Sequence, residues 1–229
     1  KKRIYGHSAT AVGAQKDKIV FFGGQDTLQQ YGDLFVLTPA TAEWSTPKAS
    51  GPAPAPRMKH SATGLSGSQI LFFGGFNKKD RVLDDAFTLD ITADGTSVTW
   101  TALAPEPPVG SKSIPARAQH AAASSSDGRY VFIFGGYDGF KSMNDLWLLD
   151  LTTQSLRIIA VDTPAPEARS RHTMHMIGDL LHIFGGYDGS KPTSGDVYTL
   201  DCSDPASMES EGGGDKKKKE EAPKEDEED

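Results

Sequence analysis

The chain has 229 residues, of which 37% are hydrophobic and 9% aromatic, so it is long enough to bury a sizeable apolar core. Its formal charge of −7 is unevenly placed, because residues 201–229 carry 12 acidic and 5 basic side chains. Residues 1–200 are therefore neutral overall, which excludes the domain-wide basic surface that nucleic acid would require. We expect no nucleic-acid partner.

The cysteine content and the longest apolar run indicate where in the cell the protein is expected. The single cysteine, Cys202, can form neither an internal disulfide nor a cysteine-based zinc site, so a reducing compartment is expected. The longest apolar run, Tyr130–Phe134, is far shorter than the roughly 20 residues that span a bilayer. These features predict a cytoplasmic protein without a membrane partner; a cytoskeleton-associated or nuclear location is also compatible. The chain begins with Lys1 instead of Met, so we expect it to be a piece of a longer one.

A unit of about fifty residues occurs four times in the sequence. Its clearest landmark is a pair of glycines after an apolar run, and the second glycines are 51, 61 and 50 residues apart. These segments are Ile19–Gly24, Ile70–Gly75, Tyr130–Gly136 and Leu181–Gly186. The units begin with His7, His60, His120 and His172. A period of this length indicates a repeat architecture.

Further residue types recur in step with the glycines. Three units have an arginine three residues before the histidine, and the first unit has Ile4 there; the arginines are Arg57, Arg117 and Arg169. After each glycine pair, a short apolar run begins with an aspartate: Asp33, Asp85, Asp145 or Asp196. Three units have a large apolar side chain further on: Trp44, Trp100 and Leu156. We expect the arginines and histidines to hydrogen-bond between neighbouring units and the aspartates to accept turn amides. The glycines are expected to serve backbone geometry.

Each unit is predicted to form four short strands, which makes the fold class all-β. The apolar runs are rich in Val, Ile, Phe and Tyr and are separated by Gly, Pro, Asp and Ser. No segment shows convincing helical periodicity. Inner runs such as Val131–Phe134 are apolar on both faces, which is typical of a sheet packed between two other sheets, as in a β-propeller.

The order Arg-x-x-His, apolar strand, Gly-Gly, Asp and Trp resembles the kelch repeat, in which one unit forms one four-stranded blade of a β-propeller. The resemblance covers residues 3–201, with repeats at about 3–50, 51–107, 108–163 and 164–203 in a domain of residues 1–203. Residues 204–229 are expected to be a disordered, charged tail. The resemblance implies a ring of six or seven blades, so we expect an incomplete ring. A closed four-bladed ring completed by residues 1–5 is the alternative.

The resemblance implies a non-catalytic protein-interaction scaffold or adaptor that binds a protein partner through the loops at one rim. Such scaffolds work within larger assemblies, among them cytoskeletal and ciliary ones. The expected rim positions follow each Gly-Gly pair or lie just before the first strand of a unit. They are Gln25, Asp26, Lys59, Phe76, Asn77, Gln119, Tyr137, Asp138, Phe140, Arg171, Tyr187 and Asp188. Further blades, from the same polypeptide or another subunit, are a second expected kind of partner.

An enzyme is the alternative, because some kelch-type proteins carry a catalytic or metal-dependent specifier site in the central channel. The sequence has no phosphate-binding loop, nucleophile elbow, dinucleotide-binding motif or His-Glu-x-x-His, so we expect no catalytic residue and no cofactor. His175 and His182 would oppose each other across a hairpin at Gly178-Asp179. Two such ligands are too few for a zinc site, so we expect buried, hydrogen-bonded histidines and no metal.

Overall fold

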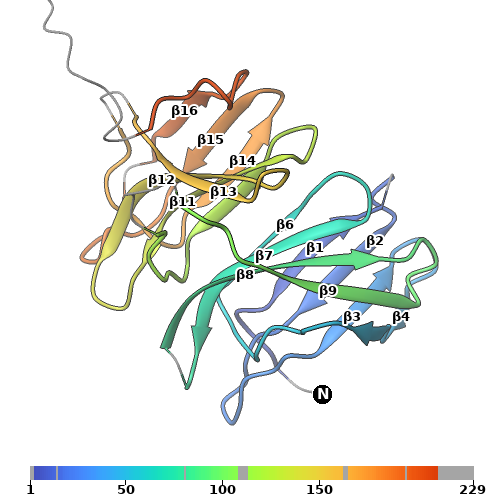
Figure 1. Ribbon diagram of the computed structural model, residues 1–229. Helices are drawn as coiled ribbons and strands as arrows, with labels where there is room; N and C mark the ends of the chain where they lie inside the picture. Colours follow the sequence, from blue (N-terminus) through green and yellow to red (C-terminus); the bar gives the residue numbers. More distant parts are fainter. Residues whose placement is uncertain are drawn as a thin grey trace, which may run out of the picture.

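Every regular element in the described part of the chain is a β-strand, which confirms the all-β prediction. The computed structural model describes residues 3–13, 15–79, 81–107, 113–161, 165–193 and 195–210. Their strands form four separate sheets, called blades 1 to 4 here in chain order (Figure 1). None of the described residues forms a helix long and apolar enough to cross a bilayer.

The strands follow each other in chain order within each blade. Blade 1 contains β1 (Ser8–Val12), β2 (Lys18–Phe22), β3 (Leu34–Thr38) and β4 (Glu43–Ser45). Blade 2 contains β6 (Ser61–Gly64), β7 (Gln69–Asn77), β8 (Arg81–Ile91) and β9 (Ser97–Leu103), and β5 (Lys48–Ser50) pairs parallel with β9. Blade 3 contains β10 (Ala121–Ser124), β11 (Tyr130–Tyr137), β12 (Ser142–Asp150) and β13 (Ser155–Ile159). Blade 4 contains β14 (Thr173–Ile177), β15 (Leu180–Phe184) and β16 (Val197–Asp201).

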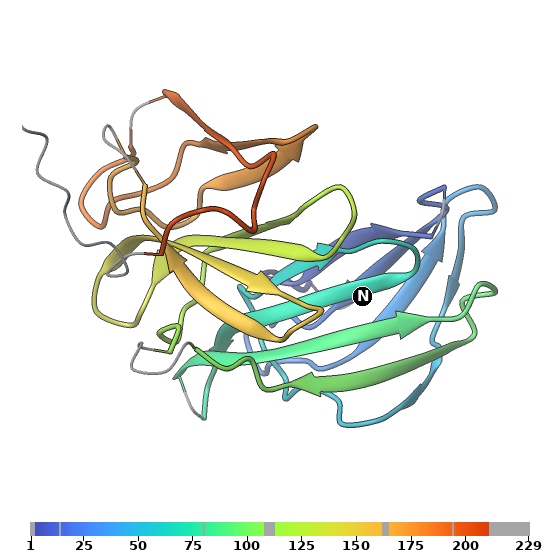
Figure 2. The ribbon, with the colours of Figure 1, turned by 45° about the horizontal axis from the view of Figure 1, so that its top comes forward.

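The four blades form an open arc, which is part of a β-propeller. The innermost strands β1, β6, β10 and β14 contact one another in that order, and among the described strands β14 has no comparable contact with β1. Figures 1 and 2 show the sheets fanned out in this sequence. Tyr5 bridges Gln25 of its own blade instead of extending blade 4, so the described residues do not form the closed four-bladed ring.

Position in the arc decides how deeply each second strand is buried. All seven residues from Tyr130 to Gly136 of β11 are buried, because blade 3 lies between two other blades. In β15 of blade 4 the burial alternates, and Leu180 and Phe184 are exposed. The prediction of strands buried on both faces is therefore confirmed for the interior of the arc and wrong at its end, where no neighbour covers the sheet.

The chain after β16 packs back onto blade 3. The amide of Ala160 donates to the carbonyl of Glu209 at 3.0 Å, and Met208 packs against the apolar cluster between blades 3 and 4. Residues 204–210, which the sequence assigned to the disordered tail, therefore belong to the packed structure. The remainder of that predicted tail, residues 211–229, lies outside the described residues.

Three of the four Gly-Gly pairs bind the backbone of the next blade. The amides of Gly24, Gly75 and Gly136 donate to the carbonyls of Arg57, Arg117 and Arg169 at 2.8, 2.9 and 2.9 Å. A Cβ at Gly23 would lie 2.6 Å from the Arg57 carbonyl oxygen, closer than real Cβ atoms approach. Gly23 also has φ +71°, so both the contact and the backbone angle require glycine.

At each of the three interfaces between blades, the phenylalanine before a glycine pair inserts into the next blade. The Phe22 ring lies between His60, Phe72 and Trp100 of blade 2, with centroid distances of 5.5, 5.2 and 5.2 Å. We call Phe22, Phe73, Phe134 and Phe184 the plug phenylalanines, and the receiving histidine and aromatic residues a socket. Aromatic pairs at these distances add to the energy of apolar burial.

The repeated arginines bind within their own blade, so the prediction that their side chains cross between units is wrong. The fully buried Arg57 makes two hydrogen bonds to the carboxylate of Asp85, at 2.6 and 2.7 Å, and Arg117 binds Asp145 in the same way. These aspartates therefore bind a guanidinium instead of turn amides. The backbone amide and carbonyl of each arginine bind the neighbouring blade. The planar guanidinium instead matches the carboxylate two strands away in its own blade.

The repeated histidines do cross between blades at two of the three interfaces. His60 Nε2 pairs with Ser8 Oγ and His120 Nε2 with Ser61 Oγ, both at 2.8 Å. Ala121 occupies the corresponding position opposite His172. Neither ring nitrogen of the buried His172 has a hydrogen-bond partner among the described residues.

The unpartnered imidazole of His172 predicts a pH dependence of stability. Burial, helped by the positive charge of Arg169, lowers its pKa from 6.5 to about 4. Between these values the unfolded chain binds a proton that the folded chain does not. The free energy of unfolding therefore falls on acidification, by up to about 1.4 kcal/mol per pH unit from this histidine.

Replacement His172→Phe should remove this contribution while keeping an aromatic ring against Phe134. Urea unfolding at neutral pH and near pH 5 should show a variant at least as stable as the parent at neutral pH, with a smaller loss on acidification. Ala121→Ser is the control, since it supplies the missing hydroxyl and keeps the titrating group. Parallel pH profiles for His172→Phe and the parent chain would contradict this assignment.

Candidate functional site

One rim of the arc is built by pairing two short segments in every blade. The residue after each Gly-Gly pair bridges the residue two positions before the repeated histidine. The bridges are Tyr5–Gln25, Met58–Phe76, Ala118–Tyr137 and Ser170–Tyr187. The rim positions expected from the sequence are therefore held by backbone hydrogen bonds at one end of the blades.

The residues just before the buried histidines have an unusual backbone conformation. Lys59, Gln119 and Arg171 have φ values of 57°, 59° and 60°, and Gly6 occupies the same position in blade 1. Their amides connect the blades in series: Lys59 donates to the Gly6 carbonyl, Gln119 to Lys59 and Arg171 to Gln119, at 2.8, 2.9 and 2.9 Å. Positive φ is uncommon outside glycine, and at these three positions it accompanies the hydrogen bonds that join the blades.

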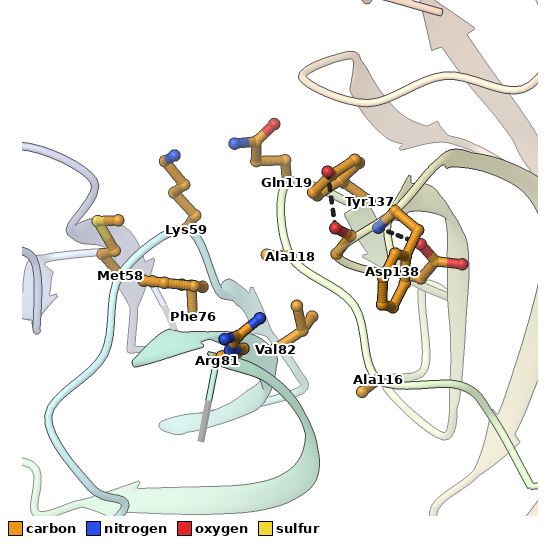
Figure 3. A pocket seen from close by; sticks show the side chains of 12 residues that line it. Met58, Lys59, Phe76, Arg81, Val82, Ala116, Ala118, Gln119, Tyr137 and Asp138 are labelled. Carbon is orange, nitrogen blue, oxygen red and sulfur yellow. Dashed lines mark hydrogen bonds between the residues drawn. The ribbon is translucent and has the colours of Figure 1, made fainter. Parts of the chain in front are cut away.

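A cavity of about 430 Å³ opens on this rim between blades 2 and 3 (Figure 3). Its lining residues are Met58, Lys59, Phe76, Arg81, Val82, Ala116, Ala118, Gln119, Tyr137, Asp138, Gly139 and Phe140. Figure 3 shows Lys59 and Gln119 on one side of the cavity and Arg81 and Val82 on the other. A mostly apolar pocket of this size with a few polar groups is typical of a binding site.

The charged groups of the cavity are mainly basic. Lys59 is half-buried, and its pKa is lowered by burial and by the nearby charge of Arg171. No ion pair joins Lys59 or Arg81 to an acidic side chain in the described part of the chain. Asp138 is committed to its own loop, where it accepts the amides of Phe140 and Lys141 at 2.8 Å each. The cavity therefore favours an acidic group beside an apolar one.

The aspartates of three rim loops fold the loops themselves. Asp26 and Asp188 accept two following amides each, as Asp138 does. Because of these bonds, the residue two positions further on is presented to solvent: Phe140 is 90% exposed and Leu28 is 83% exposed. Leu28 was not among the predicted rim residues, although its position after Asp26 matches that of Phe140 after Asp138.

The structure brings half of the twelve expected rim residues into one cavity. These six are Lys59, Phe76, Gln119, Tyr137, Asp138 and Phe140. Gln25 and Asp26 lie on the rim of blade 1, and Arg171, Tyr187 and Asp188 on that of blade 4. Asn77, at the end of β7, is only 5% exposed and offers little surface to a partner, so its expected role as a rim contact stays a prediction. Met58, Arg81 and Val82 line the cavity and were not predicted.

The candidate histidine pair has the predicted register. His175 lies directly opposite His182 on β14 and β15, but His175 is exposed, which corrects the expectation of two buried histidines. The cause is again the uncovered face of blade 4. No group of three or more potential metal ligands occurs among the residues described.

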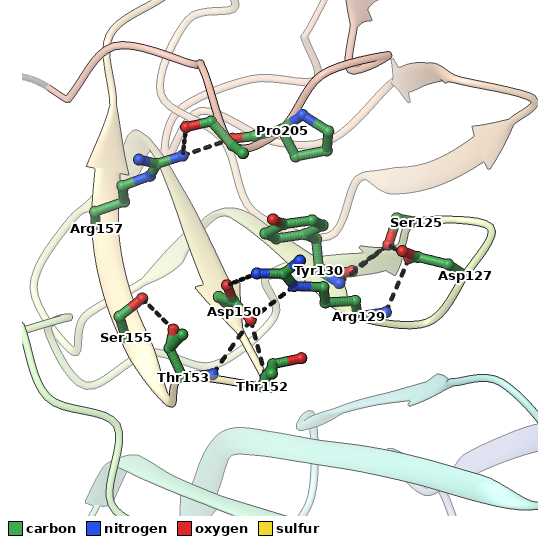
Figure 4. Close-up of polar contacts among 11 residues, drawn as sticks. Ser125, Asp127, Arg129, Tyr130, Asp150, Thr152, Thr153, Ser155, Arg157 and Pro205 are labelled. Carbon is green, nitrogen blue, oxygen red and sulfur yellow. Dashed lines mark hydrogen bonds and ion pairs between the residues drawn. The ribbon is translucent and has the colours of Figure 1, made fainter.

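A polar cluster at the other end of blade 3 consists of one structural ion pair and hydrogen bonds around it (Figure 4). Arg129 binds Asp150 at 2.8 Å, and this bond and burial, acting in opposite directions, leave the pKa of Asp150 at about 2. Arg157 donates to the carbonyls of Pro205 and Ala206, which fastens the segment after β16 to blade 3. The carboxylate of Asp150 is thus occupied within the fold.

Comparison with known proteins agrees with this architecture. The sequence matches the family described as the KLHDC2/KLHL20/DRC7 Kelch-repeats domain over residues 6–112 and 93–223. The chain belongs to the kelch-repeat family, as the sequence pattern predicted.

Three similar proteins illustrate the range of the family. The chain is 36% identical over 160 residues to the dynein alpha chain of the flagellar outer arm of Chlamydomonas reinhardtii, covering 69% of this chain and 3% of that protein. It is 31% identical over 195 residues to Kelch domain-containing protein 3 of Bos taurus, covering 80% and 47%. It is 30% identical over 203 residues to human host cell factor 2, covering 81% and 25%. The chain thus spans less than half the length of each of these relatives.

The left-handed residues of the rim allow a test of the site. Gln119→Gly removes the Cβ that makes positive φ unfavourable, so the free energy of unfolding should rise, by up to about 1 kcal/mol. Gln119→Ala keeps the Cβ and serves as the control, and urea unfolding measures both. An alanine variant as stable as the glycine variant would show that this backbone position carries no strain.

Proposed function

We propose that the chain is a non-catalytic interaction module that binds a segment of a partner protein in the cavity between blades 2 and 3. The observation that carries this proposal is the open, largely apolar cavity of about 430 Å³ on a rim fixed by backbone hydrogen bonds. Its walls come from two rigid blades, so little conformational entropy is lost when a ligand binds.

The composition of the cavity specifies the kind of segment it suits. Phe76, Tyr137 and the 90% exposed Phe140 supply the aromatic side chains that dominate binding energies at interfaces. Lys59 and Arg81 supply positive charge, which favours an acidic side chain and excludes a basic one. We therefore expect a peptide segment with an apolar residue next to aspartate or glutamate.

The relatives support a role inside larger assemblies. One is a dynein chain of the flagellar outer arm, another is a host cell factor, and each is much longer than this chain. We propose that this chain acts as a scaffold or adaptor in such an assembly, with a cytoskeletal or ciliary setting favoured by the dynein likeness. A cytoplasmic location is part of the same proposal.

A library of short random peptides, selected for binding to the purified chain, tests the proposed cavity. Selected peptides should combine an apolar residue with an acidic one. Lys59→Glu should weaken their binding by at least about tenfold because it reverses the charge, and Phe140→Ala should weaken it by a similar factor.

Leu28→Ala is the matched control, since it truncates an equally exposed side chain on the rim of blade 1, away from the cavity. Binding and thermal unfolding of all three variants should be measured together. Peptides that bind with undiminished affinity to both cavity variants would contradict the proposed site.

A further inference from the structure

The residues just before the four repeated histidines form a row along the rim, next to the innermost strands. They are Gly6, Lys59, Gln119 and Arg171, and this set is called the row below. Each amide after the first donates to the carbonyl of the preceding member, at 2.8 to 2.9 Å, so the four residues are fixed beside one another. The row contains two cations and no acidic residue.

The two cations of the row influence each other. Burial and the nearby charge of Arg171 lower the pKa of Lys59. Within the described ranges no ion pair joins either side chain to a carboxylate, and their neighbours in the row, Gly6 and Gln119, are uncharged. An anion bound between Lys59 and Arg171 would therefore relieve a repulsion that the fold itself leaves uncompensated.

Gln119 lies between the two cations and is oriented by one of them. The Nε of Arg171 donates to Oε1 of Gln119 at 3.0 Å, so the amide oxygen faces Arg171. Figure 3 shows the amide nitrogen of Gln119 on the side of Lys59. Along the row the donors are thus an ammonium, an amide NH₂ and a guanidinium.

The guanidinium of Arg171 is held on a second side as well. Its central carbon lies 5.6 Å from the centroid of the Tyr187 ring, in a cation–π contact. Because Nε is used by Gln119, the two terminal nitrogens of this exposed side chain are the ones that can bind a ligand. Two parallel donors of this kind suit the oxygens of a phosphate or a carboxylate.

The row joins the cavity between blades 2 and 3, because Lys59 and Gln119 belong to both. Other polar groups of the cavity are used within one loop: the Tyr137 hydroxyl donates to the Gly139 carbonyl at 2.8 Å, and Asp138 accepts two amides. Figure 3 shows Asp138 beyond Tyr137, on the side away from Lys59. The donors of the row therefore face a ligand whose apolar part lies on the aromatic wall of the cavity.

The charge and the number of donors in the row favour a phosphate monoester over a single carboxylate. A phosphorylated side chain carries about −1.5 to −2 charges at neutral pH and three acceptor oxygens. It can neutralise Lys59 and Arg171 together and offer one oxygen to each of the three donor side chains. One carboxylate carries a single charge, so it would leave one of the two cations unpaired.

We propose that the segment bound in the cavity carries a phosphorylated serine or threonine, whose phosphate binds Lys59, Gln119 and Arg171. This inference rests on the proposed function, because an apolar neighbour of the phosphorylated residue packs against Phe76 and Tyr137. A free phosphate ion would use the row alone. The peptide gains the cavity contacts in addition, so it binds more tightly.

Three fluorescent peptide pools test the proposal by anisotropy with the purified chain. The pools differ only in the central residue, which is phosphoserine, glutamate or serine; leucine or phenylalanine stands beside it and the other positions are mixed. The phosphoserine pool should bind at least about tenfold more tightly than the glutamate pool, and the serine pool should bind most weakly.

Arg171→Gln should remove most of this preference. We expect it to weaken the phosphoserine pool by at least about tenfold and the glutamate pool by less, because Lys59 still pairs with one negative charge. Lys48→Gln is the matched control: it removes one exposed cation on β5, where Lys48 pairs with Ser97 at the end of blade 2 opposite the rim. Thermal unfolding should show that both variants are folded.

The outcomes separate this inference from the proposed function. Equal binding of the phosphoserine and glutamate pools would overturn the phosphate site and leave peptide binding in the cavity intact, whereas a failure of every pool would overturn both. A phosphate preference that survives Arg171→Gln would also overturn the site. So would inorganic phosphate that displaces the phosphoserine pool at the concentration at which the peptides themselves bind, since the cavity would then add nothing.

Discussion

The contact between consecutive blades is the interaction on which the rest of this structure depends. A phenylalanine inserts beside the histidine of the next blade, and the following glycines approach an arginine carbonyl so closely that no Cβ fits. The hydrogen bond from Gly24 to Arg57 and its two repeats fix where each blade begins. Because a single four-stranded sheet cannot bury both of its faces, the blades are stable only as neighbours.

The rim follows from this contact. Once the blades are fixed, the amides of Lys59, Gln119 and Arg171 can bind one carbonyl after another only with left-handed backbones. Their side chains then lie at a rim that is hydrogen-bonded to the blades, which favours a preorganised binding surface. At the ends of the arc the same chemistry is left unsatisfied, as the exposed Phe184 and Trp44 show.

The sequence predicted the features that are determined within one blade, because they depend on local patterns that recur in every repeat. The Gly-Gly pairs and the all-β fold belong to this class, whereas the insertion of Phe22, Phe73 and Phe134 into the next blade was not predicted. It did not predict hydrogen-bonded side chains that are far apart in the sequence and meet across a blade, such as the Arg57–Asp85 ion pair. Nor did it show that the cavity lies between blades 2 and 3, or that Asn77 is buried, because neither is determined by the local sequence pattern.

Hydrogen exchange of the glycine amides tests the central claim most directly, under conditions where the chain is monomeric. The amides of Gly24, Gly75 and Gly136 should be protected as strongly as the inner strands, since each is bonded into the next blade. The amide of Gly186, in the same repeat position without that neighbour, should exchange rapidly. Equal protection of all four amides in the monomer would contradict the account, because it would show that protection arises within a blade and not between blades.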